Sequence, residues 1–306
     1  MKRFTLVLLF FLVGGAMAQA WNDKGHMVIA KIAWNQLTPE ERAKVMKILQ
    51  KHPHYSEFLA AKRPENIPED EWVFMRAATW SDWVRGGARR DFNRPSWHFI
   101  NYPIVAPGST VTPPELPSEN VVNQIGQSKT IVQNGNGEEQ AIHLCWLFHL
   151  VGDVHQPLHC VSFYADSFPT GDRGGNRALL RVEGRKIQLH AFWDDLLGRD
   201  TTAAALGNAV EEINALIAKT PELIKDDLAN HKNADAWAHE GLAIAKKQIY
   251  KDGTLIPANN DDRPREESIP EVGKAYAQEA GATARVRIAL AGQRLAQVIR
   301  EVIALP

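Results

Sequence analysis

One segment, His143–His159, limits the possible folds of this chain more than any other. Its sequence, HLCWLFHLVGDVHQPLH, has the apolar character of a buried helix, yet it contains four histidines and an aspartate. His149 and Asp153 are four residues apart and therefore lie on one face of a helix. Pro157 ends that helix, and His159 follows in the next turn. Converging imidazole and carboxylate groups are typical zinc ligands, so the segment predicts part of a metal site.

A second pair, His190 and Asp194, repeats the spacing of His149 and Asp153. One His-x-x-x-Asp pair is common by chance, and it usually represents a core histidine beside a surface aspartate. Two pairs, the first of them followed closely by His-Gln-Pro-Leu-His, favour a metal site instead. Further candidate ligands elsewhere in the chain are Trp21, His26, Asp82 and His98.

Residues 1–20 have the pattern of a secretory signal peptide. A basic start and an apolar run, Phe4–Gly15, precede the small-x-small triplet Ala18–Ala20, after which a signal peptidase would cleave. We therefore expect an exported protein, periplasmic or secreted, that begins at Trp21 and forms a single domain over residues 21–306. No later segment has the roughly 20 apolar residues of a membrane span, so we expect no membrane anchor.

The remaining pattern predicts a mainly α fold, a compact multi-helix domain with one short β-hairpin. Thr38, Pro39 and Glu41 form a capping box that begins a helix. Two β-compatible runs flank a Glu-Gly turn within Ala178–Leu189 and predict the hairpin. Residues 86–117 are rich in glycine and proline and predict loop and short extended pieces. Apolar residues at helical spacing predict helices over residues 26–37, 39–51, 68–83, 119–134 and 138–155 and in several segments after 201.

Charge and cysteine content add two constraints. The formal net charge is −1, whereas proteins that bind nucleic acid through their bulk charge usually have a basic excess or stripe. Any attraction for phosphate must therefore be local. Cys145 and Cys160 are the only cysteines, which excludes a disulfide-rich scaffold, and the sequence leaves open whether they pair. Nothing in the sequence indicates an obligate protein partner.

Six motifs occur in order along the chain. They are Trp21 with His26 five residues on, Trp80-Ser81-Asp82, Trp97-His98-Phe99-Ile100, His149-Leu-Val-Gly-Asp153-x-His-Gln-Pro-Leu-His159, Gly174-Gly175-Asn176 and His190-x-x-x-Asp194. Together they resemble the zinc-dependent single-strand nucleases of fungi and plants, the S1/P1 type, in the phospholipase C/P1 nuclease superfamily. The resemblance in motifs runs from Trp21 to about residue 200 and implies a mostly helical fold that holds three zinc ions.

The resemblance also implies which residues bind each metal. Grouped by zinc ion, the ligands would be Asp82, His98, His149 and Asp153 for the first, His159, His190 and Asp194 for the second, and the α-amino nitrogen and carbonyl oxygen of Trp21 with His26 and Asp153 for the third. Asp153 would therefore bridge two ions. An α-amino group has an ordinary pKa near 7.7–8.0, so zinc can displace its proton at neutral pH. This requires cleavage between Ala20 and Trp21.

The implied reaction is hydrolysis of phosphodiester bonds in DNA and RNA, within strands and preferably in single strands, with 5′-phosphate products. A 3′-nucleotidase activity is compatible with it. Zinc lowers the pKa of bound water from 15.7 to roughly 7, so Asp82 and Asp153 would act in catalysis through the metals. Arg85, three residues after Asp82, is predicted to hold phosphate. Gly174-Gly175-Asn176 would form the base pocket of a nucleic-acid substrate.

The chain departs from the family pattern in one loop, and two alternative functions stay open. Fungal members have a disulfide-linked loop whose aspartate joins the base pocket, whereas Asn101–Pro117 contains neither cysteine nor aspartate; base preference and selectivity for single strands therefore stay open. One alternative is a zinc-dependent phospholipase C of the same fold, although that group generally ends its last ligand pair with glutamate where this chain has Asp194. The other is a non-catalytic exported zinc-binding protein.

The remaining histidines are predicted to play no part in metal binding. His143 lies six residues before His149, about 240° around a helix, and should have a structural role. His155 has no assigned metal, so we expect it to pack or to orient a ligand. The others, predicted to lie at the surface, are His52, His54, His231 and His239.

Overall fold

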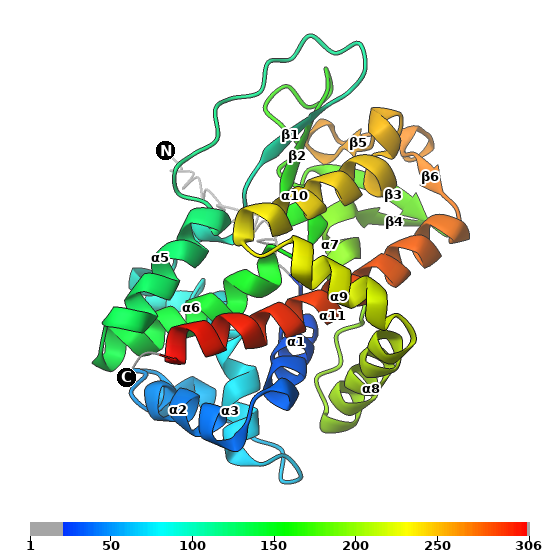
Figure 1. The fold of residues 1–306 in the computed structure, drawn as a ribbon. Coiled ribbons are helices and arrows are strands. Elements are labelled where there is room, and N and C mark those ends of the chain that lie inside the picture. The colour runs from blue at the N-terminus through cyan, green and yellow to red at the C-terminus, as the bar shows by residue number, and fades with distance from the viewer. Residues whose placement is uncertain (1–20, 305–306) are drawn as a thin grey trace, which may run out of the picture.

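The computed structural model describes residues 21–304, so the predicted signal peptide lies outside the described residues (Figure 1). Helices dominate this range, which confirms the predicted mainly α fold. The α-helices are α1 (Asp23–Gln36), α2 (Pro39–Leu49), α3 (Glu69–Ala77), α4 (Trp80–Trp83), α5 (Val121–Asn134), α6 (Gly137–Asp153), α7 (Leu189–Asp194), α8 (Ala203–Lys219), α9 (Pro221–Asn230), α10 (Ala234–Ile244) and α11 (Lys274–Ile303). Short 3₁₀ or π segments that bear on the site are η1 (Tyr55–Leu59), η3 (Pro95–His98), η4 (Pro157–His159) and η5 (Ala245–Ile249).

Two helix starts follow from side-chain caps. The Thr38 hydroxyl accepts the N–H of Glu41 at 3.2 Å, and the Glu41 carboxylate accepts the N–H of Thr38 at 2.8 Å, which confirms the capping box of α2. The side chain of Asn22 accepts the N–H of Gly25 at 3.2 Å and so caps α1. Helix α1 therefore begins earlier than predicted, directly after Trp21 and Asn22.

The helix predicted over residues 68–83 is divided into α3 and α4. The N–H and the hydroxyl of Thr79 both donate to the Arg76 carbonyl, at 3.0 and 3.1 Å. A side chain that bonds the backbone locally in this way competes with the helical pattern. Helix α4 then packs on α6 and brings Asp82 near His149.

The strand content exceeds the single hairpin that was predicted. β3 (Ala178–Val182) and β4 (Arg185–Gln188) form that hairpin. β3 also pairs with β5 (Ala258–Asn259) and β6 (Glu271–Val272), and β1 (Tyr102–Val105) runs parallel to β2 (Val161–Tyr164). The hairpin is confirmed, and the further strands were not predicted because two-residue strands such as β5 and β6 are too short to show a period of two. The strands gather at one end of the molecule (Figure 1).

Helix α6 lies at the centre of the fold. It packs against α1, α2, α3, α4, α5 and α11, and every residue from Leu144 to Asp153 is buried. Helix α11 crosses the molecule alongside α1 (Figure 1). Gly292 permits this close approach, because a Cβ atom there would lie 2.5 Å from Cγ2 of Ile32. His149 and Asp153 are thus polar residues inside the hydrophobic core.

The two cysteines do not form a disulfide. Cys145 and Cys160 are both buried free thiols, which answers the question that the sequence left open. None of the helices described between residues 21 and 304 is both long and apolar enough to cross a membrane.

Candidate metal centre

The predicted side-chain ligands converge in three buried groups. Within each group, ligand nitrogen and oxygen atoms lie within 4.8 Å of one another. The His26 group consists of His26, His149 and Asp153; the Asp82 group consists of Asp82, His98 and His149; and the His190 group consists of His159, His190 and Asp194. These residues come from α1, α4, η3, α6, η4 and α7, so the centre exists only in the folded chain.

Asp153 is the most connected residue of the centre. Its Oδ2 atom lies 2.9 Å from Nδ1 of His98 and 3.3 Å from Nε2 of His149, and its Oδ1 atom lies 3.3 Å from Nε2 of His26. The carboxylate is fully buried. One carboxylate therefore contacts three imidazoles, and its two oxygen atoms face ligands of both the His26 group and the Asp82 group.

The rings of His159 and His190 face each other in a way that calls for a cation. Nδ1 of His159 donates to the carbonyl of His98 at 2.6 Å, and Nδ1 of His190 donates to the carbonyl of Gly174 at 2.5 Å. In the neutral rings both Nε2 atoms therefore carry lone pairs, and these atoms lie 3.1 Å apart. Two lone pairs at this distance repel unless a cation lies between them. Two nitrogens bound to a tetrahedral zinc ion would lie about 3.3 Å apart.

Buried ligand atoms of the other two groups also lack partners. Among the described residues, Nδ1 of His26, Nε2 of His98 and Oδ2 of Asp82 have no hydrogen bond. Leaving a buried polar atom unsatisfied costs about 1–3 kcal/mol, which a bound cation would offset. Nδ1 of His149 donates to the Ala78 carbonyl at 2.8 Å and leaves Nε2 for a metal, as metal-binding histidines commonly do. The residues present therefore fit zinc.

The pKa shifts reflect this crowding of ligands. Burial opposes the charged form of His149, but the carboxylates of Asp153 and Asp82 outweigh burial and raise the pKa of His149 to about 9. Burial, aided by the charge of Arg85, lowers the pKa of His98 to about 3. Burial raises the pKa of Asp194 well above its ordinary value, although a hydrogen bond from Gln156 acts against it. A bound metal ion would supply the positive charge that the buried carboxylates need.

Arg85 lies against the Asp82 group. Its guanidinium is 2.8 Å from Oδ1 of Asp82, and only 13% of its side chain is exposed. Burial is the main cause of the lowered pKa of both His98 and His159, and the charge of Arg85 lowers both further. The guanidinium is thus paired with the Asp82 group, and its charge also acts on His159 of the His190 group.

The sequence did not identify two residues that hold the ligands in place. Nε2 of Gln156 donates to Oδ1 of Asp194 at 2.8 Å. Nδ2 of Asn22 donates to Asp195 at 2.9 Å and to the Gly198 carbonyl at 3.0 Å, which joins the start of α1 to the end of α7. Gln156 lies within the His-Gln-Pro-Leu-His motif, but its amide side chain is not a usual zinc ligand, so the motif did not identify it. The signal for Asn22 was its place as an N-cap.

The predicted base pocket, Gly174–Asn176, adjoins the His190 group. Gly174 and Gly175 have φ angles of +60° and +81°, which favour glycine. The Gly174 carbonyl accepts the hydrogen bond from His190, and the half-buried Asn176 donates to the Arg173 carbonyl at 2.8 Å. The turn therefore lies beside a candidate metal group.

His143 and His155 lie outside the three groups. His143 is half-buried, with Nδ1 3.2 Å from the Ser128 hydroxyl. Both ring nitrogens of the buried His155 are engaged, Nδ1 by the Val151 carbonyl at 2.7 Å and Nε2 by Arg294 at 2.8 Å, so its ring has no nitrogen left for a metal.

One prediction for a surface histidine was wrong, and another surface histidine has partners that the sequence did not reveal. His52 is only 3% exposed, because η1 follows it and its ring packs edge-on against Trp80 at 4.7 Å; burial lowers its pKa to about 3. His231 has partners, since Nδ1 lies 2.8 Å from Glu240 and 3.7 Å from Asp227. Asp227 stands four residues before His231, a spacing that the sequence analysis missed.

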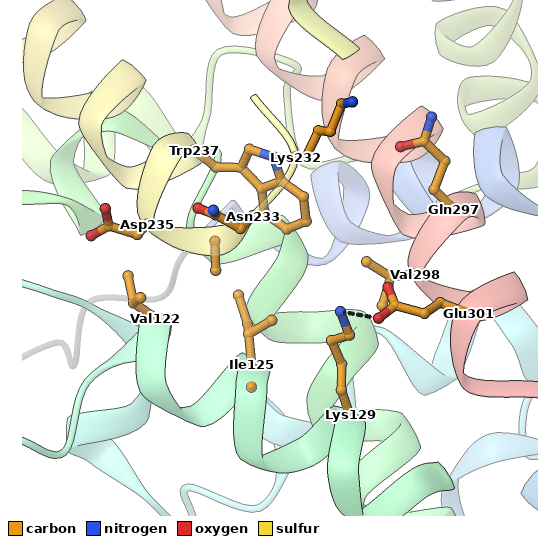
Figure 2. Close-up of a pocket in the computed structure, with 12 residues that line it drawn as sticks. Val122, Ile125, Lys129, Lys232, Asn233, Asp235, Trp237, Gln297, Val298 and Glu301 are labelled. Carbon is orange, nitrogen blue, oxygen red and sulfur yellow. Dashed lines mark ion pairs between the residues drawn. The ribbon is translucent and has the colours of Figure 1, made fainter. Parts of the chain in front are cut away.

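Figure 2 shows a cavity between α5, α10 and α11 that is separate from the metal centre. Its volume is about 300 Å³. Trp237 forms part of the lining, and Lys129 and Glu301 make an ion pair of 2.6 Å at its edge. None of the residues that line it belongs to the three groups, so this cavity takes no part in the proposal below.

Gly152 makes room for His26, and this yields a testable prediction. A Cβ atom at Gly152 would lie 2.6 Å from Nδ1 and 2.8 Å from Cε1 of His26. The His26 ring cannot retreat, because it is buried and stacks on His149 at 4.1 Å. We expect Gly152→Ala to weaken zinc binding at the His26 group about 10- to 100-fold and to cost about 1–3 kcal/mol of stability through overpacking. Chelator competition and thermal unfolding measure these effects.

Gly126→Ala is the matched control. Gly126 lies on the exposed face of α5, and a Cβ atom there would have no neighbour within 4 Å. This substitution should leave zinc affinity unchanged and raise stability by up to about 1 kcal/mol, the difference in helix propensity between the two residues. Equal zinc affinity in the two variants would show that Gly152 does not provide space for a ligand.

The structure thus defines a mainly helical protein with three buried groups of histidine and aspartate that could hold metal ions. A profile of the S1/P1 nuclease family matches residues 21–304. The chain belongs to the S1/P1 nuclease family. It is therefore a hydrolase that acts on the phosphodiester bonds of nucleic acids, and both the family and the fold predicted from the motifs are confirmed.

Named relatives cover most of the chain at low identity. Endonuclease 4 of Arabidopsis thaliana is 27% identical over 84% of each chain. Nuclease S1 of Aspergillus oryzae is 24% identical over 75% of this chain and 71% of its own length. Nuclease P1 of Penicillium citrinum is 23% identical over 92% of this chain and 97% of its own length.

Proposed function

We propose that this protein is an exported, zinc-dependent endonuclease that hydrolyses DNA and RNA, prefers single strands, leaves 5′-phosphate ends and uses three zinc ions. A 3′-nucleotidase activity is compatible with the same site. The observation that carries the zinc dependence is the pair of facing Nε2 atoms of His159 and His190, 3.1 Å apart with both Nδ1 atoms engaged. Membership of the S1/P1 nuclease family supports the reaction.

In this proposal each buried group holds one zinc ion. The Asp82 group with Asp153 would hold the first, and the His190 group the second. The third would be held by His26, Asp153 and the main-chain amino and carbonyl groups of Trp21. The fully buried Trp21 ring and the bonds of Asn22 to Asp195 and Gly198 fix the start of α1, which supports a ligand at this end of the chain.

The side chains of the centre have separate tasks. Bound zinc supplies Lewis acidity and lowers the pKa of water. Arg85, paired with Asp82 at the edge of the Asp82 group, would donate to a non-bridging oxygen of the scissile phosphate and orient it. The carbonyls of Ala78 and His98 fix His149 and His159 in the tautomer that leaves Nε2 free.

A local positive charge explains how a chain with a net charge of −1 binds phosphate. Three divalent ions exceed the charge of the three carboxylates Asp82, Asp153 and Asp194, so the centre itself attracts the substrate. In the predicted base pocket, Asn176 would bind the edge of an unpaired base. In a duplex the bases are stacked and paired, so this edge is not accessible. Single strands should therefore be the preferred substrate.

Assays of the mature protein with and without a chelator test the proposal. The substrates are single-stranded DNA, RNA, duplex DNA and phosphatidylcholine. We expect cleavage of single strands that stops when zinc is removed and returns when zinc is restored. Cleavage of the lipid but of no nucleic acid would favour the alternative of a phospholipase C, and zinc binding without turnover of any substrate would favour a non-catalytic zinc-binding protein.

One added residue before Trp21 should remove the third zinc ion. A free α-amino group can lose its proton to zinc at neutral pH, whereas the amide nitrogen that replaces it has no available lone pair. We expect mature protein with an additional N-terminal alanine to bind two zinc ions in place of three and to lose most of its activity. An alanine added after Pro306 is the control. Full zinc content in the N-terminal variant contradicts the role assigned to Trp21.

A further inference from the structure

Asp172 is a fully buried carboxylate that belongs to none of the three metal groups. It accepts the N–H of Phe163 at 2.9 Å and the hydroxyl of Tyr250 at 2.5 Å. Burial raises its pKa to about 6, and the hydroxyl of Tyr250 and the N–H groups of Phe163, Gly174 and Gly175 act against that rise. Two hydrogen bonds from separate parts of the chain to one buried carboxylate indicate a residue that organises the chain around it.

The turn around Asp172 has an unusual backbone. Arg173, Gly174 and Gly175 have φ angles of +55°, +60° and +81°. Successive N–H groups in a turn of this kind form a concave site for an anion, and here the chain's own carboxylate occupies it. Without that charge, the N–H groups that face it would lose their acceptor, and a buried N–H without an acceptor costs about 1–3 kcal/mol.

The same turn holds His190 at two points. The Gly174 carbonyl accepts the Nδ1 proton of His190 at 2.5 Å, and the Gly175 carbonyl accepts its main-chain N–H at 3.3 Å. The turn also packs closely against the backbone of Leu158, the residue before His159, because a Cβ atom at Gly174 would lie 2.2 Å from the carbonyl oxygen of Leu158. The turn therefore stands behind both histidines of the His190 group.

Tyr250 connects this turn to a distant part of the chain. It ends η5, 78 residues after Asp172, and its fully buried ring stacks on Phe163 at 4.6 Å. Phe163 itself donates its N–H to Asp172. The carboxylate is thus clamped between β2 and the segment that follows α10.

We propose that Asp172, clamped by Tyr250, is a positioning residue that orients His190 toward its zinc ion and shapes the adjoining base pocket. Its carboxylate holds the turn, the turn directs the Gly174 carbonyl to Nδ1 of His190, and the same turn sets the place of Asn176. The inference rests on the proposed function for the identity of the metal and of the pocket. The contacts themselves do not depend on it.

Two substitutions and a matched control test this inference. Asp172→Asn removes the negative charge at constant volume, and Tyr250→Phe removes only the hydroxyl. Tyr102→Phe is the control, because it deletes a tyrosine–aspartate bond, 2.7 Å to Asp235, that is exposed and involves no residue of the turn. Zinc affinity is measured by chelator competition in the absence of substrate. Steady-state kinetics compare a single-stranded oligonucleotide with bis(p-nitrophenyl) phosphate, a phosphodiester without a base.

We expect Asp172→Asn to lower the affinity for one of the three zinc ions about 10- to 100-fold, the usual effect of losing a group that orients a metal ligand. Tyr250→Phe should have a smaller effect on the same ion. The kcat for the baseless diester should fall because His190 is misaligned, and the KM for the oligonucleotide should rise because the pocket is distorted. Tyr102→Phe should resemble the wild type in every measurement.

Wild-type zinc affinity in both variants, with an unchanged ratio of oligonucleotide to diester hydrolysis, would overturn the inference. If Asp172→Asn does not fold, the zinc affinity of Tyr250→Phe tests the role of Asp172, since the phenylalanine keeps the stacked ring. The test stays distinct from that of the proposed function. A wild-type protein without nuclease activity refutes the function, whereas the zinc affinities of the variants still support or refute the role of Asp172.

Discussion

Asp153→Asn should abolish zinc binding at two of the three groups and reduce hydrolysis of single-stranded DNA by at least about 1,000-fold. Loss of a group that only orients a metal ligand costs about 10- to 100-fold in metal affinity or activity. Asp153 would itself bind two ions, so its loss should cost more. Its carboxylate contacts His26, His98 and His149. Asparagine has the same shape but offers no negative charge to either ion. Zinc content after dialysis and the rate of oligonucleotide cleavage measure the two effects.

Asp166→Asn is the control for this substitution. Asp166 is exposed, and its carboxylate accepts a hydrogen bond of 3.0 Å from the Ser109 hydroxyl. The same chemical change at this position should therefore leave zinc content and activity as in the wild type. The His190 group does not contain Asp153, and its zinc ion should remain. Three zinc ions bound to Asp153→Asn would contradict the bridging role.

Much of the fold could be predicted from local patterns. The capping box at Thr38, the hairpin around Gly184 and the central helix that ends at Asp153 are each encoded within about fifteen neighbouring residues. The break between α3 and α4 and the short strands β5 and β6 were not predicted, because they depend on partners. A two-residue strand forms where it can pair with an edge of β3, and the two residues themselves contain no pattern that predicts this pairing.

The candidate centre shows the same division. Spacing placed His149 with Asp153 and His190 with Asp194, since each pair occupies one helix. The assembly of these pairs with His26, Asp82 and His98 could be anticipated only from the resemblance to a known family. Residues that orient ligands from a distance, such as Gln156 and Asp172, carry no periodic signal of their own and became visible only through their contacts.

Glu240→Gln should destabilise the protein by about 3–5 kcal/mol. The carboxylate of Glu240 bonds Arg287 and Arg294 from α11, two arginines that are 2% and 0% exposed. Removing one partner of a buried ion pair leaves an uncompensated charge in the core, which costs about this amount. The Glu212→Gln control removes the partner of Arg285 on the same helix, but that pair is largely exposed and should contribute only about 0–1 kcal/mol. Denaturant unfolding at pH 7 compares the variants.

The pH dependence of the same variant gives an independent check. Burial opposes ionisation of Glu240, but the bonds and charges of Arg294 and Arg287 outweigh burial and lower its pKa below the ordinary 4.5. As the pH falls below that value, the unfolded chain takes up a proton at this position before the folded chain does, so the contribution of Glu240 to stability is lost. Glutamine does not titrate. The stability difference between wild type and Glu240→Gln should therefore be full above about pH 5 and should shrink steadily in more acidic solution. Because the other carboxylates titrate alike in both proteins, a difference that stays constant down to pH 3 would mean that the pair with the two arginines does not stabilise the fold.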